Sequence, residues 1–222
     1  MCGRFTITSP NAALIHLFGA VPANDLPETP RFNICPTNTV AVVTSDEGQR
    51  RLRPMRWGFL PHWYKTPTDG PLIINARSET VAEKPAFREA VRTRRCLIPA
   101  SGFYEWSEGP EKSRLPWYVT RADAQPMALA GLWQRWDAGG QAIDTCAIVS
   151  TAAGPGMTGI HHREPVVVAP ADWPLWLGEA GTGAAVLMRA SEAGVLAAPY
   201  RVAARVNSNR AEGAELIAPL AA

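Results

Sequence analysis

The chain has 222 residues, of which 46% are hydrophobic and 19% are charged, and its formal net charge is +2. This composition allows a substantial core, and the length fits one large domain or two small ones. The small net charge argues against binding by bulk charge, so a nucleic-acid interface would have to concentrate its cations on one face. The sequence has no apolar run of 18 residues and no secretory h-region, which predicts a cytoplasmic protein without transmembrane helices.

The cysteine pattern argues against a metal site. The four cysteines are Cys2, Cys35, Cys96 and Cys146, and no two of them have the C-x-x-C spacing of a zinc site. Cys35, Cys96 and Cys146 have apolar or β-branched neighbours and are expected to pack in the core as reduced thiols. We therefore expect no metal and no cofactor.

The chain contains few predicted helices and many short predicted strands. Ser9-Pro10 is typical of an N-cap followed by proline at the first helical position, and predicts a helix through about Phe18. Residues 21–38 are rich in Pro, Asn and Thr and predict a long loop. Further short helices are predicted at Pro85–Arg94, Pro170–Leu177 and Ser191–Leu196. The predicted strands are Thr39–Thr44, Arg50–Pro54, Leu72–Ile74, Cys96–Pro99, Pro116–Thr120, Met127–Trp133, Ile143–Ser150 and Val166–Ala169.

The order of these elements predicts the fold class. Strands outnumber helices, and short connections join them instead of crossover helices. This pattern indicates an α+β protein that is mainly antiparallel β, either barrel-like or a folded sheet, with short peripheral helices. No boundary divides residues 1–222, so a single domain is expected. The tail from about Ala211 is expected either to dock or to fray.

The second residue carries the most specific chemistry. A small residue after Met1 favours removal of Met1, which leaves Cys2 with both a thiol and a free α-amine. An N-terminal cysteine can condense with an aldehyde to an imine and then close a thiazolidine ring through its thiol. Alternatively, its amine can act as the internal base for the thiol. A Met-Cys start is more often an accident, so other segments have to support this chemistry.

Aromatic and amide side chains mark two further candidate segments. Trp57 and Trp63 lie in a segment where aromatics beside cations could stack bases and hold a phosphate backbone. Trp57 is expected in the core and Trp63 at the surface. Asn75, at a strand end, offers a donor and an acceptor, and Arg77 shares its face if the strand continues. A turn-forming Asn75 and a solvated Arg77 are the plainer interpretation.

Glu105 and the histidine pair are candidates for proton transfer. Glu105 lies between Tyr104 and Trp106, and desolvation by these aromatics would raise its pKa toward the acid–base range. Strand alternation alone slightly favours an exposed Glu105 with both aromatics pointing inward. His161 and His162 would face opposite ways in a strand, so only one of them is expected to reach a site.

Arginines are concentrated in two stretches of the sequence. The first contains Arg50, Arg51, Arg53 and Arg56, and the second contains Arg88, Arg92, Arg94 and Arg95. If several of them share a face with Arg4 and Arg77, they form an electropositive groove despite the small net charge.

Several motifs occur together, in order, over roughly residues 1–178. They are Met1-Cys2-Gly3-Arg4-Phe5, Arg31-Phe32-Asn33-Ile34-Cys35-Pro36-Thr37, Met55-Arg56-Trp57-Gly58, Ile74-Asn75-Ala76-Arg77-Ser78-Glu79-Thr80, Lys84-Pro85-Ala86-Phe87-Arg88, Arg95-Cys96-Leu97-Ile98-Pro99, Gly102-Phe103-Tyr104-Glu105-Trp106, Ala130-Gly131-Leu132-Trp133 and Ile160-His161-His162-Arg163. With them the chain resembles the SRAP family, the SOS response-associated peptidases or abasic-site processing proteins. So many motifs in one order make the resemblance specific, and it implies a single SRAP-type domain.

The resemblance implies a function in the DNA damage response. It implies recognition of abasic sites in single-stranded DNA, where the N-terminal cysteine forms a thiazolidine DNA–protein cross-link with the sugar aldehyde at C1′. The ring removes the imine that would drive β-elimination, so the lesion is shielded from nucleases and error-prone bypass. The implied partner is single-stranded DNA containing abasic sites. One monomer suffices, and the cytoplasmic protein is expected at the nucleoid when bound to DNA.

The resemblance also implies roles for individual residues. Cys2 matches the covalent nucleophile, and Asn75 matches the residue that orients the N-terminus or the sugar. Glu105 matches the acid–base carboxylate that assists ring opening. His161 matches the histidine that assists Schiff-base chemistry and cross-link reversal. The implied DNA contacts are Arg4 and Arg77 at phosphates, Trp63 stacked beside the sugar, and the loop residues Asn33, Pro36 and Thr37.

The chain departs from the family pattern in two places. Glu164 stands where the family commonly has methionine, and a carboxylate there could pair with Arg163 or alter His161. Residues 178–189 are rich in Gly and Ala where the family usually has a charged helix. The family's peptidase name rests on self-removal of Met1, and a general protease activity does not follow from it.

Two other functions stay open on the residues alone. An N-terminal-nucleophile amide hydrolase, such as a glutamine amidotransferase domain, also begins Met-Cys-Gly, but it leaves Glu105 and the Ile160–Arg163 segment unexplained. A non-covalent reader of single-stranded or modified DNA explains the arginines and tryptophans. It gives Cys2, Asn75, Glu105 and His161 no common purpose.

Overall fold

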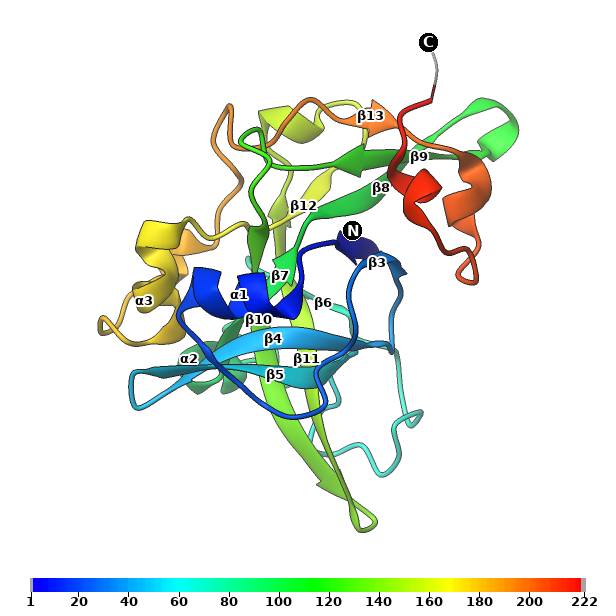
Figure 1. Ribbon diagram of the computed structural model, residues 1–222. Helices are drawn as coiled ribbons and strands as arrows, with labels where there is room; N and C mark the ends of the chain where they lie inside the picture. Colours follow the sequence, from blue (N-terminus) through cyan, green and yellow to red (C-terminus); the bar gives the residue numbers. More distant parts are fainter. Residues whose placement is uncertain (1, 221–222) are drawn as a thin grey trace.

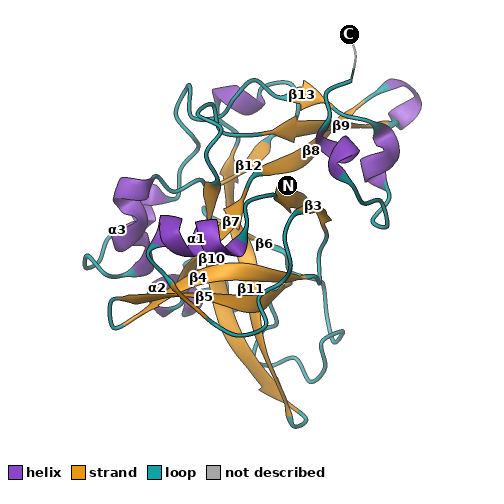
Figure 2. Cartoon of the chain, viewed as in Figure 1, coloured by secondary structure: helices purple, strands orange, loops and turns teal. Residues whose placement is uncertain are grey.

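The computed structural model describes residues 2–220, which form two β-sheets with short helices at their periphery (Figure 1, Figure 2). The strands in this part of the chain are β1 (Arg4–Ile7), β2 (Val21–Pro22), β3 (Arg31–Ile34), β4 (Thr39–Asp46), β5 (Gln49–Trp57), β6 (Asn75–Arg77), β7 (Arg95–Ala100), β8 (Gly102–Glu108), β9 (Arg114–Val119), β10 (Met127–Ala138), β11 (Gln141–Ala152), β12 (Arg163–Pro165) and β13 (Tyr200–Arg201). The α-helices are α1 (Asn11–Phe18), α2 (Ala90–Thr93) and α3 (Trp173–Leu177). None of the helices within residues 2–220 has the length and apolar character needed to cross a membrane.

Five strands of the first sheet close into a barrel. β11, β10, β7, β4 and β5 follow one another through antiparallel pairs. β5 then returns to β11 in parallel, with Arg56 opposite Thr145 and Trp57 opposite Cys146. Closure satisfies the backbone groups that an open sheet would leave unpaired at its edges. Outside the ring, β6 and β12 add to β11, and β2 adds to β5.

The second sheet places the start of the chain beside Glu105. Its strand order is β13-β9-β8-β1-β3, and β7 of the barrel continues into β8 across Ser101 alone. β1 is an interior strand of this sheet, paired antiparallel with β8 on one edge and with β3 on the other. Because Arg4 lies opposite Tyr104, the same register places Gly3 opposite Glu105.

One hydrophobic core runs through both sheets. It joins Phe5 of β1 and Phe103 of β8 with Trp57 of β5, and all three side chains are buried. The rings of Phe5 and Trp57 meet edge to face, with centroids 5.0 Å apart and an interplanar angle of 65°, an arrangement that aromatic quadrupoles favour. The indole Nε1 of Trp57 donates to the carbonyl oxygen of Ile74 at 3.0 Å. This bond satisfies a buried donor and ties the segment before β6 to the barrel.

The predicted fold class is confirmed, and the barrel is the form that the sheet takes. Both strands of the predicted hairpin between Thr39 and Pro54 are present, as are the four strands predicted between Cys96 and Ser150. Several of these strands are longer than predicted, because pairing with neighbouring strands extends them beyond the local apolar run. The tail docks, since Ala211 and Leu216 pack in a buried cluster with Tyr104 and Tyr118.

Three predictions near the site are wrong. The predicted loop 21–38 contains β3, because Arg31–Ile34 pairs with β1 from a distant part of the chain. The strand predicted at Leu72–Ile74 is replaced by Asn75–Arg77, because the register with β11 begins at Asn75. Val166–Ala169 is not a strand, because its hydrogen bonds go to two different strands. The N–H of Val166 donates to the carbonyl oxygen of Val149 in β11, and the N–H of Val168 donates to that of Ala128 in β10.

Predicted helices are shorter than expected. α1 begins after Pro10, one residue later than predicted, and Ser9 does not cap it. The predicted helix Pro85–Arg94 is regular only over Ala90–Thr93, and Ser191–Leu196 forms turns. Short segments of this kind take their shape from packing, because helix nucleation alone is unfavourable. α3 lies within the predicted Pro170–Leu177 helix.

Gly131→Ala should destabilise the barrel. Gly131 of β10 lies between β7 and β11, and a Cβ there would come within 2.7 Å of Sγ of Cys96 and 3.0 Å of Cδ1 of Ile98. Overpacking of this kind costs about 1–3 kcal/mol, which should lower the midpoint of urea unfolding. The control is Gly156→Ala, whose Cβ would meet nothing nearer than 3.5 Å. Equal midpoints for Gly131→Ala and the wild type would contradict this account of the packing.

Candidate active site

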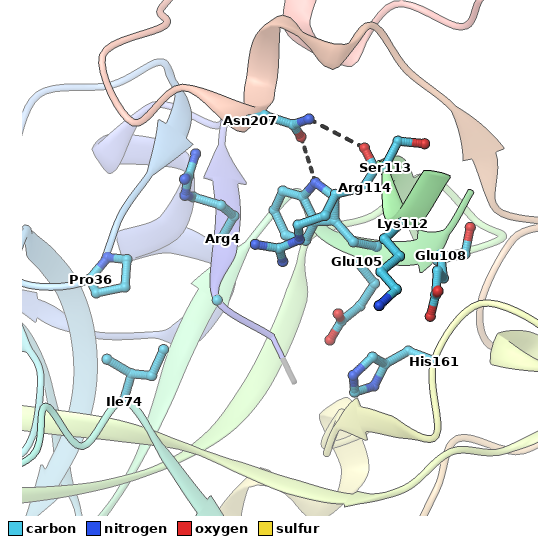
Figure 3. A pocket seen from close by; sticks show the side chains of 13 residues that line it. Arg4, Pro36, Ile74, Glu105, Glu108, Lys112, Ser113, Arg114, His161 and Asn207 are labelled. Atoms are coloured by element: carbon cyan, nitrogen blue, oxygen red, sulfur yellow. Dashed lines mark hydrogen bonds between the residues drawn. The ribbon is translucent and has the colours of Figure 1, made fainter. Parts of the chain in front are cut away.

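An open cavity of about 1000 Å³ lies beside the N-terminal end of β1 (Figure 3). Its walls come from the start of β1, the β8–β9 hairpin, the segment before β6, the loop before β12 and the C-terminal region. The lining residues are Gly3, Arg4, Pro36, Ile74, Glu105, Trp106, Ser107, Glu108, Lys112, Ser113, Arg114, His161 and Asn207. Segments far apart in the sequence therefore meet at the start of the chain.

Cys2 directly precedes the cavity wall at Gly3 and is fully buried. Its carbonyl oxygen accepts a hydrogen bond from Nδ2 of Asn75 at 2.9 Å. Burial, followed by the negative charge of Glu105, raises the pKa of the Cys2 thiol well above its ordinary value. The buried thiol is therefore held in its neutral form, and it needs a nearby base before it can act as a nucleophile. The predicted removal of Met1 concerns a residue outside the described part of the chain.

Asn75 is positioned to hold the main chain at Cys2. It begins β6, which pairs in parallel with β11 through Ile148. While its Nδ2 holds the Cys2 carbonyl, its Oδ1 is buried and accepts no hydrogen bond within residues 2–220. A buried acceptor of this kind is costly unless a ligand or another group uses it.

Glu105 is buried, which overturns the slight preference for an exposed carboxylate. Its residue exposure is 2%, and it lines the cavity from β8. Alternation places Tyr104 on the other face of β8, where its hydroxyl donates to the carbonyl oxygen of Phe32 at 2.8 Å. Both faces of β8 are therefore covered. Burial raises the pKa of the Glu105 carboxyl, while a hydrogen bond from the backbone of Trp106 and the charge of Arg114 act against this shift.

His161 faces the cavity from the loop before β12. Its Nδ1 accepts a hydrogen bond from the backbone N–H of Arg163 at 3.0 Å, and the carbonyl oxygen of Arg163 lies 3.2 Å from the same nitrogen. The first contact favours the neutral tautomer with its proton on Nε2, and the second offers an acceptor once Nδ1 is protonated. Burial lowers the pKa of His161.

The two histidines do not alternate as a strand would require. They precede β12, and their rings stack with centroids 4.4 Å apart and an interplanar angle of 25°. Only His161 of the two lines the cavity. In Figure 3 the carboxylate of Glu105 and the imidazole of His161 point toward one another across the cavity floor. The fold thus brings Cys2, Asn75, Glu105 and His161 to one place.

Cations line one wall around a tryptophan. The guanidinium carbons of Arg114 and Arg4 lie 4.9 Å and 5.9 Å from the ring centroid of Trp106, within cation–π range. Nε1 of Trp106 donates to Oδ1 of Asn207 at 2.6 Å. Lys112 extends into the same space (Figure 3). No ion pair within residues 2–220 includes Arg4, Lys112 or Arg114.

Sequence reasoning missed Lys112, Arg114 and Asn207. The two cations stand close together after a strand that carries Glu105 and Trp106, which was the available signal. Nothing local shows that the β8–β9 hairpin folds over the same cavity as Arg4. Asn207 could not have been found, because its contact with Trp106 spans 101 positions.

The predicted DNA-contact residues are dispersed. Arg4 and Pro36 line the cavity. Asn33 is buried, accepts a hydrogen bond from Arg4 at 2.7 Å, and donates to the carbonyl oxygens of Ser208 and Ala211. Thr37 is exposed, and its backbone N–H donates to the carbonyl oxygen of Trp57. Arg77, which is exposed, and Trp63, which is 48% exposed as expected for a surface residue, do not line the cavity.

The arginine-rich stretches do not form the groove. Arg50 pairs with Glu179, Arg53 with Asp144, and Arg94 with Glu89. Arg95 donates to backbone carbonyl oxygens, including that of Trp176 at 2.5 Å. None of the eight residues in these stretches lines the cavity. The charge of the cavity wall therefore comes from Arg4 and the β8–β9 hairpin.

Comparison with known proteins assigns this chain to a family. The family model of SOS response associated peptidase (SRAP) matches residues 1–209. The chain belongs to the SRAP family. The resemblance in the motifs is thereby confirmed, and the match includes every residue that lines the cavity. In residues 2–220 of this SRAP chain, no group of three or more His, Cys, Asp and Glu side chains could hold a metal ion.

Relatives of this SRAP chain match it over nearly its whole length. The abasic site processing protein YoqW of Bacillus subtilis strain 168 is 34% identical over 224 residues, which cover 98% of this chain and 99% of that protein. The abasic site processing protein YedK of Escherichia coli strain K12 is 30% identical, with 99% and 100% covered. A crystal structure of a protein from Bacteroides thetaiotaomicron has a TM-score of 0.86 at 20% identity, with 99% and 100% covered. It supports the fold.

Glu105→Gln should raise stability at neutral pH. Because burial raises the pKa of Glu105 in the folded protein, the folded state binds this proton more tightly than the unfolded state. The stabilising contribution of the protonated carboxyl is complete below its unfolded pKa and is lost as the pH rises through its folded pKa. The variant should therefore melt at a higher temperature than the wild type at about pH 8, and the difference should shrink toward about pH 4.

The matched control is Glu108→Gln, which neutralises an exposed carboxylate in the wall of the same cavity. Its melting temperature should follow that of the wild type more closely across the same pH range. A pH-independent difference for Glu105→Gln would contradict the argument from burial.

Proposed function

We propose that this protein recognises abasic sites in single-stranded DNA and, after Met1 is removed, forms a covalent cross-link with them through Cys2. The observation that carries the proposal is the convergence at the start of β1. Asn75 holds the carbonyl of Cys2 at 2.9 Å, while Glu105 and His161 face the adjoining cavity. The names of the full-length relatives YoqW and YedK, abasic site processing proteins, support the same substrate.

The reaction balances with the groups at hand. The ring-opened sugar of an abasic site carries an aldehyde at C1′, and the α-amine of Cys2 adds to it and expels one water to give an imine. The sulfur of Cys2 then adds to the imine carbon, its proton passes to the nitrogen, and a thiazolidine ring closes. The product is protein plus DNA minus one water. The ring no longer offers the imine through which β-elimination would cleave the strand.

Glu105 and His161 would move the protons in this sequence. Burial raises the pKa of Glu105, which favours its protonated form, and in that form it can donate to the sugar oxygen during ring opening. His161 is kept neutral by its lowered pKa. Its Nδ1 accepts a hydrogen bond from the N–H of Arg163, so proton exchange with the substrate falls to Nε2. The buried Oδ1 of Asn75 can accept from the freed amine.

The cation wall would bind the phosphates that flank the lesion. Arg4, Lys112 and Arg114 face the cavity and form no ion pair within residues 2–220, so their charge is available to a DNA strand. Asn33 acts through Arg4, whose guanidinium it holds. We assign Pro36, which lines the cavity, and the exposed side chains of Arg77, Trp63 and Thr37 to the flanking nucleotides. The proposed reaction needs one lesion and one Cys2, so a monomer would suffice.

Cys2→Ala should abolish the cross-link. The substrate is a single-stranded oligonucleotide with one uracil, treated with uracil-DNA glycosylase. When it is mixed with the mature wild-type protein, a shifted band should appear on a denaturing gel. Its intact mass should equal protein plus DNA minus one water. The control is Cys35→Ala, which removes another buried cysteine, directly after β3, and should leave the adduct intact.

A stable adduct in Cys2→Ala would refute the thiazolidine mechanism. If the wild type, with Met1 confirmed removed, binds the oligonucleotide but forms no adduct, the protein is a non-covalent DNA reader. Release of ammonia from glutamine would instead establish an amide hydrolase.

Lys112→Ala and Arg114→Ala should each weaken binding and its salt dependence. In a Cys2→Ala background, which prevents cross-linking, each variant should reduce the slope of log affinity against log salt by about 0.7, the value for one phosphate contact on a single strand. The control is Arg189→Ala, which removes an exposed arginine that does not line the cavity. Unchanged slopes for Lys112→Ala and Arg114→Ala would remove the β8–β9 hairpin from the DNA interface.

A further inference from the structure

Glu164 is a buried carboxylate that the proposed reaction does not use. It lies in β12 opposite Thr151 of β11, and its exposure is 0%. It does not pair with Arg163, whose guanidinium instead donates to both carboxylate oxygens of Glu79 and to Ser150. No ion pair within residues 2–220 includes Glu164. A carboxylate so placed needs strong hydrogen bonds to stay buried.

Two backbone amides supply these hydrogen bonds. The N–H of Gly154 donates to Oε2 of Glu164 at 2.8 Å, and the N–H of Ser191 donates to Oε1 at 2.6 Å. The two donors belong to loops that meet here, since a Cβ built on Gly154 would lie 3.0 Å from the carbonyl oxygen of Ser191. Glu164 therefore joins two chain segments that no regular secondary structure connects.

One of these segments leads directly to His161. The loop runs from Ala153 to His162, and its ends are closed by a hydrogen bond from the N–H of Ala153 to the carbonyl oxygen of His162 at 3.0 Å. Met157, in the middle of the loop, is fully buried. Gly154 stands at the base of this loop, where its contact with Glu164 limits how the loop can tilt. Residues that support an active-site loop from behind decide the geometry of the groups it carries.

We propose that Glu164 is a positioning residue that holds the 153–162 loop, and with it His161, in place at the cavity. This inference rests on the proposed function for its kinetic consequence and on the fold alone for its structural one. Loss of the two amide contacts should loosen the loop and admit water around His161. The proton-transfer partner of Cys2 would then be misplaced.

The test compares Glu164→Gln with Glu192→Gln. A glutamine at position 164 keeps one acceptor oxygen but turns an NH2 group toward the second amide, so one contact is lost. Glu192 follows Ser191 directly, and its side chain is 72% exposed, so Glu192→Gln removes a charge from the same segment without touching the buried contact. Cross-linking by Glu164→Gln should slow about tenfold, while Glu192→Gln should match the wild type.

A double-mutant cycle separates positioning from general stability. In a His161→Ala background, Glu164→Gln should cause no further loss of rate, because the residue it acts through is gone. An undiminished tenfold loss in that background would overturn the proposal. So would a lower melting temperature of Glu164→Gln with an unchanged cross-linking rate.

The ring of His161 gives a readout that needs no DNA. In ¹⁵N–¹H spectra of its imidazole, assigned by comparison with His161→Ala, Glu164→Gln should shift the ring signals. It should also raise the pKa of His161 toward its ordinary value, because burial is what lowers that pKa. Ring signals and titration identical to the wild type would overturn the inference, even if no cross-link were ever found. Conversely, shifted ring signals without any cross-link would refute only the proposed function.

Gly154→Ala provides a second variant if Glu164→Gln fails to fold. The backbone of Gly154 has φ −84° and ψ −174°, which alanine adopts freely. Its Cβ would press against the carbonyl oxygen of Ser191 at 3.0 Å and Cβ of Ala190 at 3.1 Å, which disturbs the same junction while Glu164 remains. The same shift of the His161 signals is expected, and its absence in a folded protein would count against the inference.

Discussion

The interior position of β1 is the constraint on which the site depends. A strand at the start of a chain is ordinarily the first to fray. Here β1 pairs with β8 on one edge and β3 on the other, and Phe5 packs edge to face against Trp57 of the barrel. Because Cys2 is only three residues before Phe5, its place follows from this anchoring. The position of Cys2 is thus fixed by the core.

Burial favours the neutral form of three groups of the site, Cys2, Glu105 and His161. It raises the pKa of the Cys2 thiol and of the Glu105 carboxyl, and it lowers the pKa of the His161 imidazole. Each shift favours the neutral form, because charge is costly where water is excluded. In the cation wall, Arg114 is exposed and Arg4 is half-buried, so their charges are less costly than a charge at the buried groups.

Side-chain bonds to the backbone hold the irregular walls of the cavity. Asn33 bonds the carbonyls of Ser208 and Ala211, and Glu164 bonds the amides of Gly154 and Ser191. In each case a side chain from a strand satisfies backbone groups in a loop that has no ladder of its own. Binding residues often lie on loops that a rigid scaffold positions. In this protein, these side-chain hydrogen bonds position the loops.

The sequence by itself determined the mainly antiparallel α+β class, the burial of Trp57, and the identity of Cys2, Asn75, Glu105 and His161 as the candidate group, because apolar patterning and motifs are local. Only the tertiary structure decided that Arg31–Ile34 is a strand and that Glu105 is buried, since both depend on pairing with β1. It also decided that Lys112 and Arg114, not the long arginine stretches, line the cavity. These outcomes depend on contacts between distant segments, whose register and orientation no local pattern encodes.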